Sequence, residues 1–264
     1  MAATGLLRIL RAPAAAAGVL AGQVVHAAHR PDMPGLENQD PSGTFGDPDA
    51  PLVTIALLGD SSITAPGVEP LDAAWPRRMA ARLGDRYRTR LVSVARGGSK
   101  ARDVLAEQLA PALAARPDLA LVSVGANDAL RGTPVARFEA EMTEILGRLA
   151  AATSGVGVSG IGDLGTLPRL PTLAKGIGRV RGRSLDRAIL RAASRFPNVV
   201  KGQAWGPQWR LFEEGDPAIV FAPDRFHASA VGHATFAAAV EPVIDELLRR
   251  MDAERHRATR RSTG

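Results

Sequence analysis

The sequence contains no cysteine and few aromatic residues, and each shortage excludes certain kinds of functional site. Without cysteine there are no disulfides, no thiolate nucleophile and no cysteine–zinc site. Aromatic residues make up 4% of the chain, which is too few for a platform on which nucleic-acid bases stack. The net charge of +6 comes largely from arginines in 179–195 and near the C-terminus. This distribution and the scarcity of aromatics lead us to expect no nucleic-acid partner.

Metal and cofactor motifs are also missing. Three of the five histidines lie in the terminal segments, so no metal-binding cluster is expected. The sequence has no phosphate-binding Gly-x-x-x-x-Gly-Lys-Ser/Thr loop and no dinucleotide-binding Gly-x-Gly-x-x-Gly after the first predicted strand. We therefore predict chemistry that needs neither cofactor nor metal.

The two ends of the chain differ from its middle. Arg8 and Arg11 precede an uncharged run at 12–28, a pattern typical of a signal peptide or membrane anchor. The run is mostly alanine and shorter than the ~20 residues that span a bilayer, so an amphipathic or disordered extension remains an alternative. We predict a signal-like or anchor-like segment at 1–30 and a linker rich in Pro, Gly and Asp at 31–51. Export or membrane association is favoured, with a cytoplasmic location as the alternative.

Residues 52–252 alternate between two patterns and predict one domain, followed by a basic tail at 253–264. Short apolar runs suited to buried parallel strands occur at 52–58, 90–95, 119–124, 156–161 and 198–201. Stretches with helical spacing occur at 70–84, 101–116, 134–151, 179–196 and 233–252. This alternation predicts an α/β fold of three layers, with a parallel sheet between helices. Ligands of such sheets bind beyond the carboxyl ends of the strands.

A serine, a histidine and an aspartate are candidates for nucleophilic chemistry at that edge. Gly59-Asp60-Ser61 follows the first apolar run, and Asp224 precedes His227 by three residues in a later loop. A serine hydroxyl needs a neighbouring base to become a nucleophile, and the base needs a third group to orient it. The simpler interpretation is that Ser61 or Ser62 caps the following segment. Of the other histidines, His233 is expected to be a packing or capping residue.

Two further turns could supply hydrogen-bond donors to an oxyanion. Gly97-Gly98 follows the second apolar run, and Gly125-Ala126-Asn127-Asp128 follows the third. Glycine permits close backbone approach and positive φ, so the Gly98 N–H can point at a developing negative charge. The Asn127 amide is a side-chain donor suited to the same charge. Ordinary turn chemistry is the alternative at both places.

These four motifs, in this order and approximate spacing, resemble the SGNH hydrolases, the GDSL-like lipase and esterase superfamily. The resemblance covers roughly 52–250 and implies a flavodoxin-like fold with a five-stranded parallel sheet between helices. It implies a serine esterase with Ser61 as nucleophile, His227 as base and Asp224 as its orienter. The oxyanion hole would consist of the Ser61 and Gly98 N–H groups and the Asn127 side chain. Gly97 remains an alternative to Gly98. Ser62-Ile63-Thr64 and Ala228 depart from the usual family residues, which leaves the substrate open.

The expected substrate is a small or lipid-like carboxylic ester. Two segments are candidates for the pocket walls, 162–178 and 204–223, and the second carries four of the chain's few aromatic residues. Those aromatics suit an acyl chain, or they fill a gap in the core. An acyltransferase or thioesterase would use the same residues. A non-catalytic protein of this fold that binds a membrane surface or carbohydrate is the remaining alternative. Membrane association through 1–30 is a further expected contact.

Overall fold

The computed structural model describes residues 33–262 and contains one six-stranded sheet. The strands are β1 (Gly43–Phe45), β2 (Leu52–Gly59), β3 (Arg88–Ser93), β4 (Leu119–Ser123), β5 (Gly155–Val158) and β6 (Val199–Lys201). Their order across the sheet is β1-β3-β2-β4-β5-β6, and all neighbours are parallel except β1 and β3. The predicted α/β class and parallel sheet are therefore confirmed.

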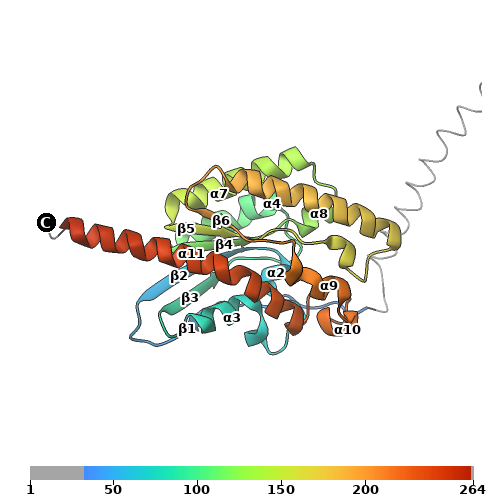
Figure 1. Ribbon diagram of the computed structural model, residues 1–264, viewed down its shortest axis with the longest axis horizontal. Coiled ribbons are helices and arrows are strands. Elements are labelled where there is room, and N and C mark those ends of the chain that lie inside the picture. The colour runs from blue at the N-terminus through green and yellow to red at the C-terminus, as the bar shows by residue number, and fades with distance from the viewer. Residues whose placement is uncertain (1–32, 263–264) are drawn as a thin grey trace, which may run out of the picture.

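Helices cover both faces of the sheet (Figure 1). One face packs against α4 (Ala101–Asp103), the π-helical turn η2 (Val104–Gln108), α5 (Leu109–Ala114), α7 (Val135–Ala152) and α8 (Thr172–Ala193). The other packs against α3 (Trp75–Arg82) and the long α11 (Ala230–Ser262). The shorter elements are α2 (Ser61–Thr64), η1 (Leu71–Ala73), α6 (Ala126–Leu130), η3 (Leu164–Thr166), η4 (Pro207–Trp209), α9 (Arg210–Glu214) and α10 (Pro217–Val220).

The central strand β2 shows how the sequence builds two cores. Val53, Ile55 and Leu57 belong to the cluster that includes α3 and α11, whereas Ala56 and Leu58 belong to the cluster that includes α7 and α8. Side chains alternate between the faces of a strand, so a strand covered on both sides reads as a continuous apolar run. Full burial of one such side chain is worth about 1.5–3 kcal/mol. This packing holds the end of β2 where the next residues form the site.

The structure differs from the sequence-based prediction at both edges of the domain. The segment 31–51, predicted as a linker, contains β1, which adds an antiparallel sixth strand along β3. Three residues are too few to give an alternating pattern that a sequence can reveal. At the other end, α11 continues to Ser262, so most of the predicted basic tail is helical. Arg255 from this part forms an ion pair with Asp118 at 2.8 Å.

The predicted signal-like or anchor-like segment lies outside the described residues. Between residues 33 and 262, the structure contains no helix that combines the length and the apolar character needed to cross a bilayer.

His233, in the first turn of α11, has the packing position that the sequence predicted. Its side chain is 2% exposed, and its Nδ1 accepts a hydrogen bond from the Trp75 N–H at 3.2 Å. Burial lowers the pKa of His233 to about 3, and the positive potential of His227 and Arg78 acts in the same direction. The imidazole is therefore neutral in the folded protein and links the start of α11 to α3.

We expect His233 to make the protein sensitive to acid. Its pKa is lower in the folded state than in the unfolded chain, so its stabilising contribution is complete above pH 6.5 and falls as the pH drops towards 3. By pH 4.5 this loss reaches roughly 2–3 kcal/mol of unfolding free energy. Urea denaturation at pH 7 and pH 4.5 measures it. His233→Asn keeps an acceptor for Trp75 but does not titrate, so the variant should lose less stability; an equal loss in both proteins would contradict the assignment.

Candidate functional site

The five predicted site residues lie around one cleft of about 530 Å³ at the carboxyl edge of the sheet. Ser61, Gly98, Asn127, Asp224 and His227 all line it. Three of them lie within five residues of the ends of β2, β3 and β4, and the other two come from the loop before α11. The strand order places β2 between β3 and β4, so the turns that follow these three strands are neighbours in space.

The turn after β2 fixes the position of Ser61. Gly59 has φ +149°, and a Cβ atom at this position would lie 1.9 Å from the Ser123 carbonyl oxygen, so only glycine fits. Asp60 is the N-cap of α2, and its carboxylate accepts the Ser62 N–H at 2.9 Å. Burial raises the pKa of Asp60 above its ordinary value, although this hydrogen bond opposes the shift. Ser61 is the first residue of α2, where backbone N–H groups have no partner within the helix.

The two adjacent serines point to different places. Ser61 lines the cleft, whereas Ser62 lines a separate cavity, and its Oγ lies 2.6 Å from the Ser123 Oγ. The capping function considered for these serines belongs to Asp60. Ser61 is therefore the serine of this turn that lines the cleft.

Asp224 and His227 form the hydrogen-bonded pair that the sequence suggested. The Asp224 Oδ2 lies 2.6 Å from the His227 Nδ1. The other carboxylate oxygen accepts the N–H groups of Phe226 and His227, both at 3.0 Å. Asp224 is 3% exposed. Burial alone would raise its pKa, but the hydrogen bonds from His227 and Phe226 hold the pKa below its ordinary value. The carboxylate thus orients the ring, with Nε2 as the remaining ring nitrogen.

Ser61 and His227 share the cleft, but no hydrogen bond joins them within the described part of the chain. Hydrogen bonds of catalytic groups are often long in the absence of substrate and shorten when it binds. The absence of this hydrogen bond is therefore compatible with proton transfer between the two residues when a substrate is bound.

The turn after β3 distinguishes between the two candidate glycines. Gly98 has φ +79°, and the only atom within 4 Å of a Cβ built there is the Arg131 Nη2 at 3.6 Å. A Cβ at Gly97 would instead lie 2.0 Å from the Asn38 Oδ1. Gly97 therefore packs against Asn38, while Gly98 has the left-handed backbone that glycine favours, with open space beside it. Asn127 is half-buried in α6 and lines the cleft.

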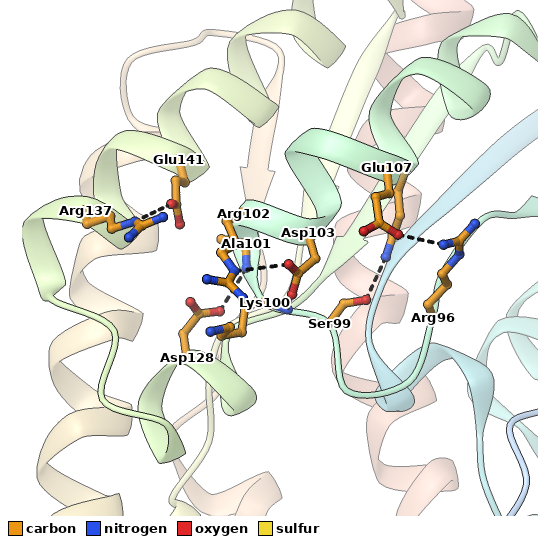
Figure 2. A network of polar contacts seen from close by, with 11 residues as sticks. Arg96, Ser99, Lys100, Ala101, Arg102, Asp103, Glu107, Asp128, Arg137 and Glu141 are labelled. Atoms are coloured by element: carbon orange, nitrogen blue, oxygen red, sulfur yellow. Dashed lines mark hydrogen bonds and ion pairs between the residues drawn. The ribbon is translucent and has the colours of Figure 1, made fainter.

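Asp128 and Asn38 are neighbours of the site that sequence reasoning did not single out. Asp128 is fully buried, and its Oδ2 accepts the Ala101 N–H at 2.9 Å, which ties α6 to the start of α4. Figure 2 shows this carboxylate pointing toward Ala101. Burial raises the pKa of Asp128, and the nearby Glu141 also raises it. The only signal for Asp128 was its place after Asn127. Asn38 lies in the segment that was predicted as a linker, and no sequence signal distinguished it there.

All four aromatic residues of 204–223 line the second cavity, and none of them lines the cleft. Trp209, Phe212 and Phe221 line the second cavity, of about 220 Å³, and their rings pack with one another and with Phe236. These aromatic rings therefore form a wall of the second cavity, which Asp60 and Ser62 also line. The segment 162–178 does reach the cleft, through Arg169, Leu170, Pro171, Ala174, Ile177 and Gly178.

The part of the chain that the structure describes contains no group of three or more His, Cys, Asp or Glu side chains arranged to hold a metal ion.

Comparisons with known proteins identify relatives of this chain. The GDSL-like esterase Rv1075c of Mycobacterium tuberculosis is 27% identical to this chain over 191 residues. The match spans 70% of this chain and 59% of that protein. The solved structure of TesA superposes with a TM-score of 0.60 at 22% identity and covers 74% of this chain and 99% of its own.

The acetylxylan esterase Axe2 of Geobacillus stearothermophilus, in its S15A form, superposes with a TM-score of 0.58 at 18% identity and covers 76% of this chain and 95% of its own. At these identities the two solved structures indicate a common fold only. The model of the GDSL-like Lipase/Acylhydrolase family matches residues 57–235, which is more than half of the chain. This range contains all five predicted site residues and confirms the resemblance drawn from the motifs. The chain belongs to the GDSL-like lipase/acylhydrolase family.

Proposed function

We propose that this protein hydrolyses carboxylic esters through an acyl-enzyme formed on Ser61. The observation that carries the proposal is the Asp224–His227 pair, joined at 2.6 Å, on the same cleft as the Ser61 side chain. A hydroxyl, an imidazole and a carboxylate that orients it are the three groups that nucleophilic acyl transfer needs. Family membership supports ester hydrolysis as the reaction.

The reaction proceeds in two halves. The Ser61 Oγ attacks the ester carbonyl carbon while the His227 Nε2 takes the hydroxyl proton. The tetrahedral intermediate then expels the alcohol, which receives that proton from His227. In the second half a water molecule attacks the acyl-enzyme, again with His227 as base, and releases the carboxylic acid and the free Ser61.

Three donors stabilise the negative charge that develops on the carbonyl oxygen. They are the Ser61 N–H, the Gly98 N–H and the Asn127 side-chain amide, all on the cleft. Donors that are fixed before the reaction begins stabilise the transition state most, because they need no reorganisation when the charge appears.

The lining of the cleft favours esters with a small or moderately apolar acyl group. Leu130, Leu170, Pro171 and Ile177 provide apolar surface near the predicted triad, while Arg131 and Arg181 add positive charge at its wall. The proposed substrate class is a small-molecule or lipid-like ester. Membrane association through residues 1–30 remains a prediction.

A series of p-nitrophenyl esters from acetate to longer acyl chains tests the proposal. Accumulation of the acyl-enzyme predicts a burst of up to one p-nitrophenol per protein molecule where deacylation is slower than acylation. Adding an alcohol as competing acceptor separates hydrolysis from acyl transfer, because a transferase forms the new ester in preference to the acid. No ester cleavage above the background rate would contradict the proposal.

Asn127→Ala is expected to lower kcat by about 10²–10³-fold, because it removes one oxyanion donor. KM should change little, since the donor acts mainly on the transition state. Steady-state kinetics on p-nitrophenyl acetate measure both constants.

The matched control for this variant is Asn198→Ala. The Asn198 amide donates to the Ala150 and Thr153 carbonyl oxygens, remote from the cleft lining. This control should lower stability and leave kcat unchanged. Full kcat in Asn127→Ala would show that Asn127 is not a donor.

A further inference from the structure

Gln108 makes a buried hydrogen-bonded bridge at the end of β2. Its side chain is 1% exposed. The Oε1 accepts the Gly59 N–H at 2.8 Å, and the Nε2 donates to the Gly59 carbonyl at 2.9 Å. The same Nε2 donates to the Ser99 Oγ at 3.0 Å. One amide thus joins the strand that leads to Ser61 and the loop that carries Gly98.

The bridge takes the place of a missing strand. β3 pairs with β2 only as far as Leu57 opposite Ser93, so the β3 side of Gly59 has no strand beside it. A primary amide presents one acceptor and two donors, which matches the N–H and carbonyl of Gly59 in the manner of a sheet ladder. The carbonyl also accepts the Arg96 N–H at 3.1 Å. The last residue of β2 is therefore paired although β3 has ended.

The helix geometry places Gln108 for this contact. Gln108 ends the π-helical turn η2, between α4 and α5. Single π-helical turns within an α-helix occur frequently at functional sites. Figure 2 shows Ser99 on the loop below this helix, with its hydroxyl directed toward it.

We propose that Gln108 is a positioning residue for the oxyanion hole, an inference that rests on the proposed function. Gly59 lies two residues before Ser61, and Ser99 is the residue after Gly98. By binding both, the Gln108 amide fixes the spacing between the two backbone N–H donors. Asp128 performs the equivalent task on the other side of the Gly98 loop. It directly follows Asn127, and its carboxylate accepts the Ala101 N–H. The Gly98 loop is thereby held between the other two donors of the hole.

Gln108→Met tests this inference, because it keeps the length and apolar stem but removes all three hydrogen bonds. We expect kcat for p-nitrophenyl acetate to fall by about 10–10²-fold, less than the loss of a whole donor, with KM within about twofold of wild type. Ser99→Ala breaks only one bond of the bridge and keeps the Gly59 pair, so its kcat should fall by less.

Gln108→Glu gives a readout that a merely structural residue would not. A buried carboxyl group has a raised pKa, and its protonated form keeps one acceptor and one donor for Gly59. The ratio of its kcat to that of wild type should therefore fall as the pH rises and the carboxyl ionises. The ratio for Gln108→Met should stay low at every pH.

Thermal denaturation and Asn198→Ala control for stability, and all rates are taken well below the unfolding midpoint. If Gln108→Met does not fold, Ser99→Ala and Gln108→Glu decide the question. Wild-type kcat in every folded Gln108 and Ser99 variant, while Ser61→Ala is inactive, would overturn the positioning role alone. Full activity of Ser61→Ala would instead overturn the proposed function on which it rests.

Discussion

Ser61→Ala is expected to reduce kcat for ester hydrolysis on the order of 10⁶-fold, the scale seen when a triad serine is removed. The reason is that, among the described residues that line the cleft, Ser61 alone carries a hydroxyl group. Ser62, the nearest alternative in sequence, has its Oγ 2.6 Å from the Ser123 Oγ and faces the second cavity. The variant should remain folded, because Asp60 supplies the cap of α2.

Ser62→Ala is the matched control for this prediction. It removes a hydroxyl one residue away, in the same short helix, without touching the cleft. We expect the rate of p-nitrophenyl ester cleavage to change by less than about tenfold, since the lost Ser123 contact lies outside the cleft lining. A comparable collapse of both variants would mean that the turn as a whole, and not the Ser61 hydroxyl, determines activity.

Asp224→Asn is the second large effect, with an expected fall in kcat of about 10⁴-fold. One oxygen of Asp224 accepts the N–H groups of Phe226 and His227, so an asparagine oxygen keeps that position. The new NH₂ group then faces the His227 Nδ1, which must accept its hydrogen bond. The imidazole proton moves to Nε2, and this tautomer cannot take a proton from Ser61.

The same substitution at Asp216 provides the control. The Asp216 carboxylate likewise accepts a backbone N–H group two residues later, that of Ala218 at 2.8 Å, but Asp216 does not line the cleft. Asp216→Asn should leave kcat unchanged. An Asp224→Asn protein with more than about a tenth of wild-type kcat would contradict the orienting role of Asp224.

The low pKa of Asp224 also has a consequence for stability. Its stabilising contribution is present above its ordinary pKa of 3.8 and is lost as the pH falls through the lower value of the folded state. Loss of activity between neutral pH and pH 5 therefore cannot come from protonation of this carboxylate.

Much of the site could be predicted from the sequence because its chemistry follows strand ends. Ser61, Gly98 and Asn127 each come a few residues after an apolar run, and parallel strands bring their carboxyl ends to one edge. Asp224 and His227 were recognisable because a spacing of three residues lets a carboxylate reach a ring nitrogen. Gly97 and Gly98 could not be separated from sequence, since the difference lies in backbone φ and in the proximity of Asn38.

The remaining features depend on contacts that no local pattern records. β1 is three residues long and is recognisable only by its pairing with β3. Gln108 looks like any polar residue of an amphipathic helix, and its burial follows from a π-helical turn and the early end of β3. The aromatic residues of 204–223 suggested a wall of the substrate pocket, but the tertiary fold gathers Trp209 and Phe212 around the second cavity.

Identification of the residue that carries a covalent adduct tests the central claim most directly. The full-length protein is treated with a fluorophosphonate, digested, and its peptides are analysed by mass spectrometry, in parallel with Ser61→Ala and Ser62→Ala. The account predicts one adduct per chain, on Ser61, in wild type and in Ser62→Ala, and none in Ser61→Ala. An adduct on another residue, or full esterase activity in protein that carries no adduct, would contradict it.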